Sequence, residues 1–198
     1  MKNKEERVFK ASEFIEIIHL SRVAFPMLKT AKKKRQFSKQ LKERIMLAIT
    51  NVNGCALCSF VHTKIALKSG LNASEIKSLL GGEKDQVSDE DLVAILFAEH
   101  FAYSKENPDK EVLDKLVETY GDLRANLILA SAVMISLTNA IGITMDLLKK
   151  RFTFKRDKRS SLLGELAILA LIPYAGLNLI IGRLFGTKKR QKLVTKFV

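Results

Sequence analysis

The sequence predicts an all-α protein, and three observations support this fold class. Long segments run without a helix breaker, and the chain of 198 residues contains only three prolines. No segment alternates apolar and polar residues with the period of two that is typical of a half-buried strand. Hydrophobic residues make up 47% of the chain, which is enough to fill the core of one domain. We therefore expect packed helices without a sheet.

The expected helices follow one another along the chain with short connections. The first covers residues 11–29, and Pro26 is expected to kink or end it. A basic linker, residues 31–36, leads to a second helix over 39–52, for which Ser38 is a suitable N-cap. Further helices are expected over residues 55–68, 73–80, 88–105, 108–120 and 122–151. The uncharged part of the last of these is long enough to span a membrane, but its polar side chains favour a buried core helix.

A second apolar segment, residues 162–185, lies near the end of the chain. Pro173 and Gly176 interrupt it, and basic clusters flank it at 149–159 and 188–196. Each half is too short to cross a bilayer, so the pattern predicts a helical hairpin that lies at a membrane surface or packs on protein. We therefore expect a helical domain over residues 10–150, followed by a basic and apolar extension over 151–198. The extension is either such a hairpin or an interface element.

The formal net charge of +13 suits an anionic partner, either acidic lipid or nucleic acid. No nucleic-acid-binding motif is present and few aromatic residues lie between the basic ones, so an anionic membrane surface contacted by 151–198 is favoured over nucleic acid. Solvated basic faces without a partner remain the alternative. No apolar run follows the first residues, so no secretory signal is predicted. We expect a cytoplasmic protein, either free or peripheral to the cytoplasmic face of the membrane.

The residues with the clearest chemistry lie between positions 43 and 62. Both cysteines, Cys55 and Cys58, are three positions apart, His62 follows the second by four, and Glu43 precedes the first by twelve. On a helix that starts after Asn53-Gly54, both cysteines and the histidine share one face. An imidazole that takes the thiol proton makes sulfur a nucleophile, and a carboxylate can orient that imidazole. A second thiol close by can then close a disulfide. The same four side chains could instead bind zinc, although a second pair of ligands is missing, or the cysteines could be inert core residues.

This spacing resembles the alkylhydroperoxidase D and carboxymuconolactone decarboxylase family, whose pattern is Glu, eleven residues, Cys-x-x-Cys, three residues, His. The four residues match it position for position, and Ala66 to Leu71 looks like the family's helix–glycine–helix continuation. One position departs from the pattern, because Leu57 stands where some members have a further histidine.

The resemblance implies an alkylhydroperoxidase-like helical domain, assembly into trimers or hexamers, and thiol peroxidase activity without a metal or other cofactor. Cys58 would attack the peroxide, Cys55 would resolve the product, His62 would take the proton and Glu43 would support His62. A dithiol reductant protein or a small thiol would restore the thiols. Two other functions stay open: a membrane-associated binding or scaffolding protein with a vestigial cysteine pair, and lactone or decarboxylase chemistry known elsewhere in the family.

Overall fold

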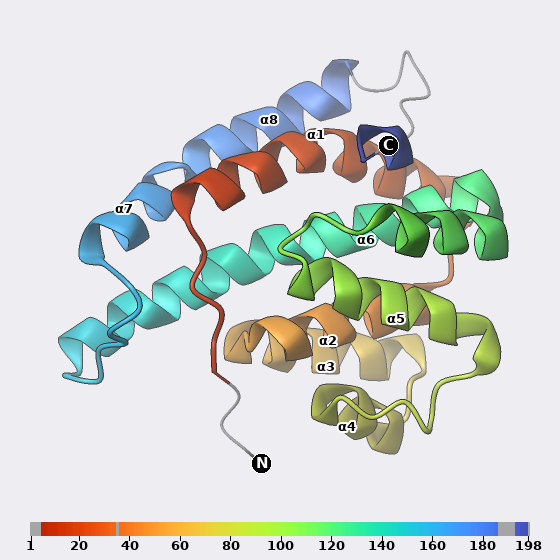
Figure 1. Cartoon of the computed structure of the whole chain (residues 1–198), viewed down its shortest axis with the longest axis horizontal. Helices are drawn as coiled ribbons and strands as arrows, with labels where there is room; N and C mark the ends of the chain where they lie inside the picture. Colours follow the sequence, from red (N-terminus) through yellow and green to blue (C-terminus); the bar gives the residue numbers. More distant parts are fainter. Residues whose placement is uncertain (1–4, 35, 186–192, 198) are drawn as a thin grey trace.

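The computed structural model describes residues 5–34, 36–185 and 193–197, and these residues form helices without any strand. The all-α prediction is therefore confirmed for this part of the chain. Figure 1 shows how the helices are arranged. Their bounds are α1 Ala11–Lys34, α2 Lys39–Asn53, α3 Ala56–Ser69, α4 Ala73–Gly81, α5 Asp89–Tyr103, α6 Lys110–Phe152, α7 Leu162–Ala170, α8 Ile172–Phe185 and the short 3₁₀ helix η1 Val194–Lys196.

Helix α6 crosses the middle of the molecule, and α1, α2 and α5 pack against it (Figure 1). Its uncharged stretch supplies most of the central core, and 83% of its most apolar 18-residue stretch is buried. The polar side chains within it are accommodated by bonds to the helix itself or to neighbours: Ser131 donates to Leu127 O, and Ser136 donates to Glu106 on the loop after α5. Helix α6 is long and apolar enough to cross a membrane. Because most of its apolar stretch is buried inside the protein, it is the core helix that the sequence predicts.

The end of α1 differs from the prediction. Helix α1 continues through Pro26 to Lys34, so proline does not end it and the expected linker is partly helical. Proline removes only one backbone hydrogen bond, and α1 packs along α6 and α8, which holds its backbone in place. The span labelled α6 covers the two predicted helices over 108–120 and 122–151, and Gly121 between them has φ +69° and ψ 163°, which are non-helical values, so the predicted break at this position is confirmed.

The predicted hairpin over residues 162–185 is wrong, because α7 and α8 follow each other in nearly the same direction (Figure 1). Leu171 between them keeps a right-handed helical conformation, and its carbonyl accepts from Ala175 N at 2.9 Å. Pro173 lies in the first turn of α8, where its missing N–H is not needed. The proline therefore starts a helix rather than reversing the chain. Most of the predicted basic cluster at 188–196 lies outside the described residues.

The other predicted helix starts and ends agree closely with the structure. Ser38 caps α2 by accepting from Leu41 N. Glycines with left-handed φ values, Gly54 and Gly70, end α2 and α3. His19 is exposed and lies 3.0 Å from the Tyr174 hydroxyl on α8. The contact between His19 and Tyr174 thus helps to join α8 to α1.

Candidate functional site

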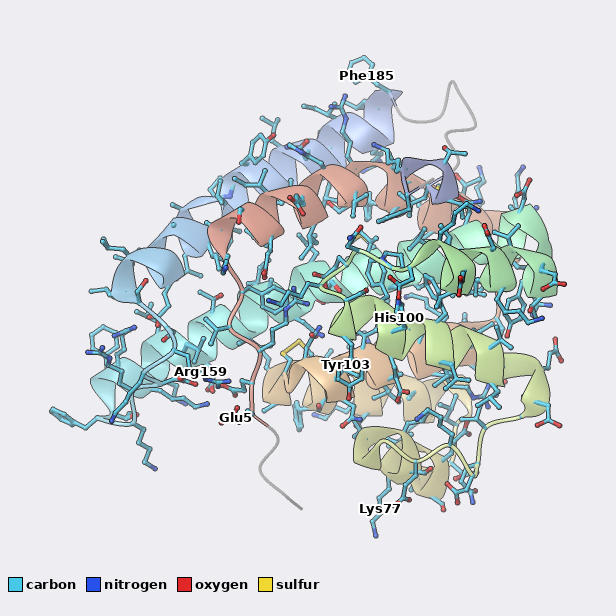
Figure 2. The ribbon with its side chains drawn as sticks, viewed as in Figure 1. Glu5, Lys77, His100, Tyr103, Arg159 and Phe185 are labelled. Carbon is cyan, nitrogen blue, oxygen red and sulfur yellow. A yellow bond between two sulfur atoms is a disulfide. The ribbon has the colours of Figure 1, made fainter. Side chains whose placement is uncertain are left out.

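The two cysteines lie where α2 ends and α3 begins. Gly54 closes α2, and its N–H donates to Thr50 O at 2.9 Å. Cys55 is the N-cap of α3, one position before the helix rather than in its first turn as the predicted helix over 55–68 places it, and its Sγ accepts from Cys58 N at 3.3 Å. This turn brings the two side chains together, and the structure joins Cys55 to Cys58 in a disulfide with a Cα–Cα separation of 5.3 Å (the yellow bond in Figure 2).

The disulfide is buried against α6. Only 1% of Cys55 and 7% of Cys58 are exposed, so Cys58 is the more accessible of the two. The Sγ of Cys58 lies 3.7 Å from Thr138 O, a carbonyl to which a reduced thiol could donate. Gly142 lies one turn further along α6, and a Cβ placed there would come within 3.0 Å of Cys55 Sγ and 3.3 Å of Cys58 Sγ. A residue with a side chain would therefore crowd the sulfur pair.

Glu43 and His62 form a direct contact between α2 and α3. The Oε2 atom of Glu43 lies 2.7 Å from Nδ1 of His62, and the carboxylate side chain is only 4% exposed. A carboxylate can only accept here, so Nδ1 carries the proton and donates it. The lone pair of a neutral His62 is then on Nε2, which is the arrangement that a general base requires. Lys42 Nζ lies 3.7 Å from the other oxygen of Glu43.

The structure thus brings the four predicted residues together as two pairs, Cys55 with Cys58 and Glu43 with His62. A hydrogen bond between His62 and Cys58 is not among the contacts of the described residues. In this structure the Cys58 sulfur is bonded to Cys55 and lies beside Thr138 O of α6. Among the described residues, no group of three or more His, Cys, Asp or Glu side chains is arranged to hold a metal ion.

Glu99 and His100 on α5 also carry titratable side chains, but both have other partners. Glu99 binds Lys84 at 2.9 Å, and His100 accepts from Asp109 N at 3.1 Å, so neither joins the cysteines. Gly142 and Thr138 were not predicted as site residues. The signal for Gly142 was a lone glycine inside an otherwise uninterrupted helix, which often marks a close packing contact.

Comparison with known families identifies the segment that carries these residues. Residues 20–98 match the family model described as the carboxymuconolactone decarboxylase family. The predicted resemblance to this family is therefore confirmed over this segment. It includes α2, α3 and α4 and most of α1 and α5, whereas α6, α7 and α8 lie outside the match. No curated protein and no solved structure gives a significant match to the chain.

The close packing of Gly142 on the disulfide can be tested by stability measurements. We expect Gly142→Ala to lower the free energy of unfolding of the oxidised protein by about 1 kcal/mol, because cross-linked sulfurs cannot turn away from the added methyl. Gly176→Ala is the matched control, since Gly176 lies in α8 with nothing within 4 Å of its Cβ position. There alanine should stabilise by roughly 0.5–1 kcal/mol through helix propensity. Equal changes in the free energy of unfolding for the two variants, measured in urea, would contradict the close packing of Gly142 on the sulfurs.

Proposed function

We propose that this protein is a thiol-dependent peroxidase that reduces alkyl or other hydroperoxides through a redox disulfide between Cys55 and Cys58. The observation that carries the proposal is the Glu43–His62 hydrogen bond of 2.7 Å on the helices that also hold the cysteine pair. A buried structural disulfide would have no use for an oriented imidazole one helical turn away. The match of residues 20–98 to the carboxymuconolactone decarboxylase family model supports an enzyme but does not choose between peroxidase and decarboxylase chemistry.

The proposed reaction begins with the reduced protein. His62 Nε2 takes the proton of Cys58, and the thiolate attacks one oxygen of the hydroperoxide. The O–O bond breaks, the alkoxide leaves with a proton as the alcohol, and Cys58 becomes a sulfenic acid. The Cys55 thiol then attacks the Cys58 sulfur, water leaves, and the disulfide forms. A dithiol reductant restores both thiols by exchange and becomes a disulfide itself. No step needs a cofactor.

The partners in this proposal are a dithiol reductant protein or small thiol and other copies of the chain. Helix α3 buries few of its side chains within one chain, and it exposes large apolar residues around the cysteines. These are Leu57, Phe60, Val61, Ile65 and Leu67, each at least 41% exposed. Exposed apolar side chains of this number support the expectation that a second copy or the reductant covers α3, as in a trimer or hexamer. A cytoplasmic location, where thiols are kept reduced, suits the same cycle.

Peroxide consumption with a dithiol donor tests the function. The wild type should consume an organic hydroperoxide catalytically, and Cys58→Ser should reduce the rate to that of the donor alone. A loss of at least a hundredfold is expected because serine is not ionised at neutral pH. Ser59→Ala, next to the cysteine on α3, is a matched control that should keep the wild-type rate. Equal rates for wild type and Cys58→Ser would exclude the peroxidase and leave the decarboxylase or scaffolding functions.

A further inference from the structure

Helices α7 and α8 expose a continuous apolar surface, which we call the apolar ridge. Its members are Leu162, Leu163, Leu166, Tyr174, Leu177, Ile180, Leu184 and Phe185, which are 41–80% exposed. They recur at steps of three and four, as along Leu177, Ile180 and Leu184, so they lie on one side of the helix. Between residues 162 and 182 the only charged side chain is Glu165, and it is buried. The outward side of these two helices therefore carries no charge over most of its length.

The ridge does not span a membrane in this structure, although residues 162–185 are long and apolar enough to do so. The opposite side of α8 packs on α1, and Gly182 lies so close to it that a Cβ would overlap the Arg22 carbonyl oxygen. Helix α7 is tied to α6 by Arg151, whose Nε and Nη2 bind Glu165 at 2.7 and 2.9 Å. Burial raises the pKa of Glu165, but hydrogen bonds from Arg151 and Ser160 outweigh it and hold the pKa below its usual value. Both helices thus lie along the surface of the folded protein and are held there by these contacts.

Basic side chains surround the ridge. At its start lies a cavity of about 590 Å³ between the segment before α1, the end of α6 and α7, and Leu162 belongs to both the cavity and the ridge. Lys10, Arg156 and Lys158 line this cavity, and none of the three forms a salt bridge with a described residue. Along α1, which runs beside α8 (Figure 1), the exposed charged residues are Glu16 and the basic Arg22, Lys29, Lys32, Lys33 and Lys34. Excess positive charge therefore borders an apolar surface.

Two aromatic side chains before α7 are exposed and are not part of the buried core. Phe152, the last residue of α6, is 78% exposed, and Phe154, in the connection that leads to α7, is fully exposed. Phe154 also has φ +56°, a left-handed conformation that is rare for a bulky residue and costs energy. Glycine or asparagine would fold more easily at this position. An exposed phenylalanine in a strained conformation indicates that its side chain contacts something outside the chain.

We propose that the apolar ridge, Phe154 and the basic cavity bind the surface of an anionic phospholipid bilayer. The ridge would lie parallel to the membrane with its leucines at the boundary of headgroups and acyl chains. Arg156 and Lys158 would contact lipid phosphates, and the cavity could admit a headgroup. Charge favours this occupant over a second copy of the chain, because two ridges that met face to face would bring two basic borders together. The proposal is independent of the peroxidase activity.

Co-sedimentation with lipid vesicles tests the proposal on the full chain. Vesicles of phosphatidylcholine with a third of phosphatidylglycerol should bind the protein, and pure phosphatidylcholine vesicles should bind it much less. High salt should release most of it, since charges at a surface are screened. Arg156→Gln with Lys158→Gln should lower the partition coefficient about 25-fold, at about a factor of five per basic residue. Lys68→Gln with Lys77→Gln removes the same charge far from the ridge (Lys77 is labelled in Figure 2) and should have a much smaller effect.

Two further variants separate the surface from the fold. Phe154→Gly should weaken vesicle binding while leaving the melting temperature unchanged or higher, because glycine relieves the left-handed strain. Leu177→Ser with Ile180→Ser should also weaken binding, whereas Leu96→Ser with Leu123→Ser, exposed residues of α5 and α6, should not. Wild-type binding both by Phe154→Gly and by Leu177→Ser with Ile180→Ser would overturn the proposal. Ridge variants that lower the oligomer mass in light scattering, with vesicle binding unchanged, would assign the ridge to a contact between copies.

Discussion

Replacing His62 by alanine should lower kcat/KM for peroxide reduction by about a hundredfold or more, the usual contribution of a general base. The reason lies in the proposed mechanism: Glu43 accepts from His62 Nδ1 at 2.7 Å, so the lone pair of His62 is on Nε2, the atom proposed to take the Cys58 proton. Without the imidazole, only the small fraction of thiolate present at neutral pH can react. The rate should then recover at alkaline pH, where the thiol ionises by itself.

The role of Glu43 follows from combining the two changes. Glu43→Gln alone should also reduce the rate, because an amide no longer holds the proton on Nδ1 or stabilises the charged imidazole. If the two residues act as one unit, Glu43→Gln with His62→Ala should cost little more than His62→Ala alone. Multiplied losses would show that Glu43 acts separately from His62. Glu75→Gln is a matched control, because Glu75 is another buried carboxylate, paired with Arg44 outside the site. It should lower stability while leaving the rate of the folded protein unchanged.

The pairing of Glu43 with His62 could be predicted from the sequence, because it depends only on the spacing of residues on two adjoining helices. Glu43 and His62 lie on helices joined by a single tight turn at Gly54, so their side chains meet without help from distant parts of the chain. The position of Gly142 could not be predicted in the same way. It reaches the sulfurs from α6, 84 residues after Cys58, and only the three-dimensional packing of α6 on α3 brings them together.

The same distinction explains the errors in the fold. Pro26 and Pro173 were treated as breaks because proline removes a hydrogen bond, which is a local rule. In the structure both lie within helical segments, one fixed by packing on α6 and α8 and the other in a first turn. The close approach of Gly182 to Arg22 holds α8 along α1, and no local pattern reports such a contact. Tertiary packing thus decided the direction of residues 162–185 and left their apolar side facing outward.

Removing the second thiol should stop the cycle after its first step. In Cys55→Ser, Cys58 still reacts with peroxide, but no neighbouring thiol can condense with the sulfenic acid. Mass spectrometry after one equivalent of peroxide should therefore find one added oxygen on Cys58, and further oxidation with excess peroxide. The disulfide-linked cycle should be lost, leaving only slow direct reduction by the dithiol. In Cys58→Ser, by contrast, Cys55 should remain unmodified.

Two structural features bear on this assignment, and they point in opposite directions. Cys55 Sγ accepts from Cys58 N at the start of α3, a position that favours a thiolate on Cys55. Cys58 is the more exposed of the two, 7% against 1%, and it lies one helical turn from His62. The difference in exposure favours Cys58 as the thiol that reacts with peroxide, because a thiolate that peroxide cannot reach does not react. A hydrogen-bonded Cys55 thiolate is then well suited to attack the neighbouring sulfenic acid. Added oxygen on Cys55 in the Cys58→Ser protein would reverse the two roles.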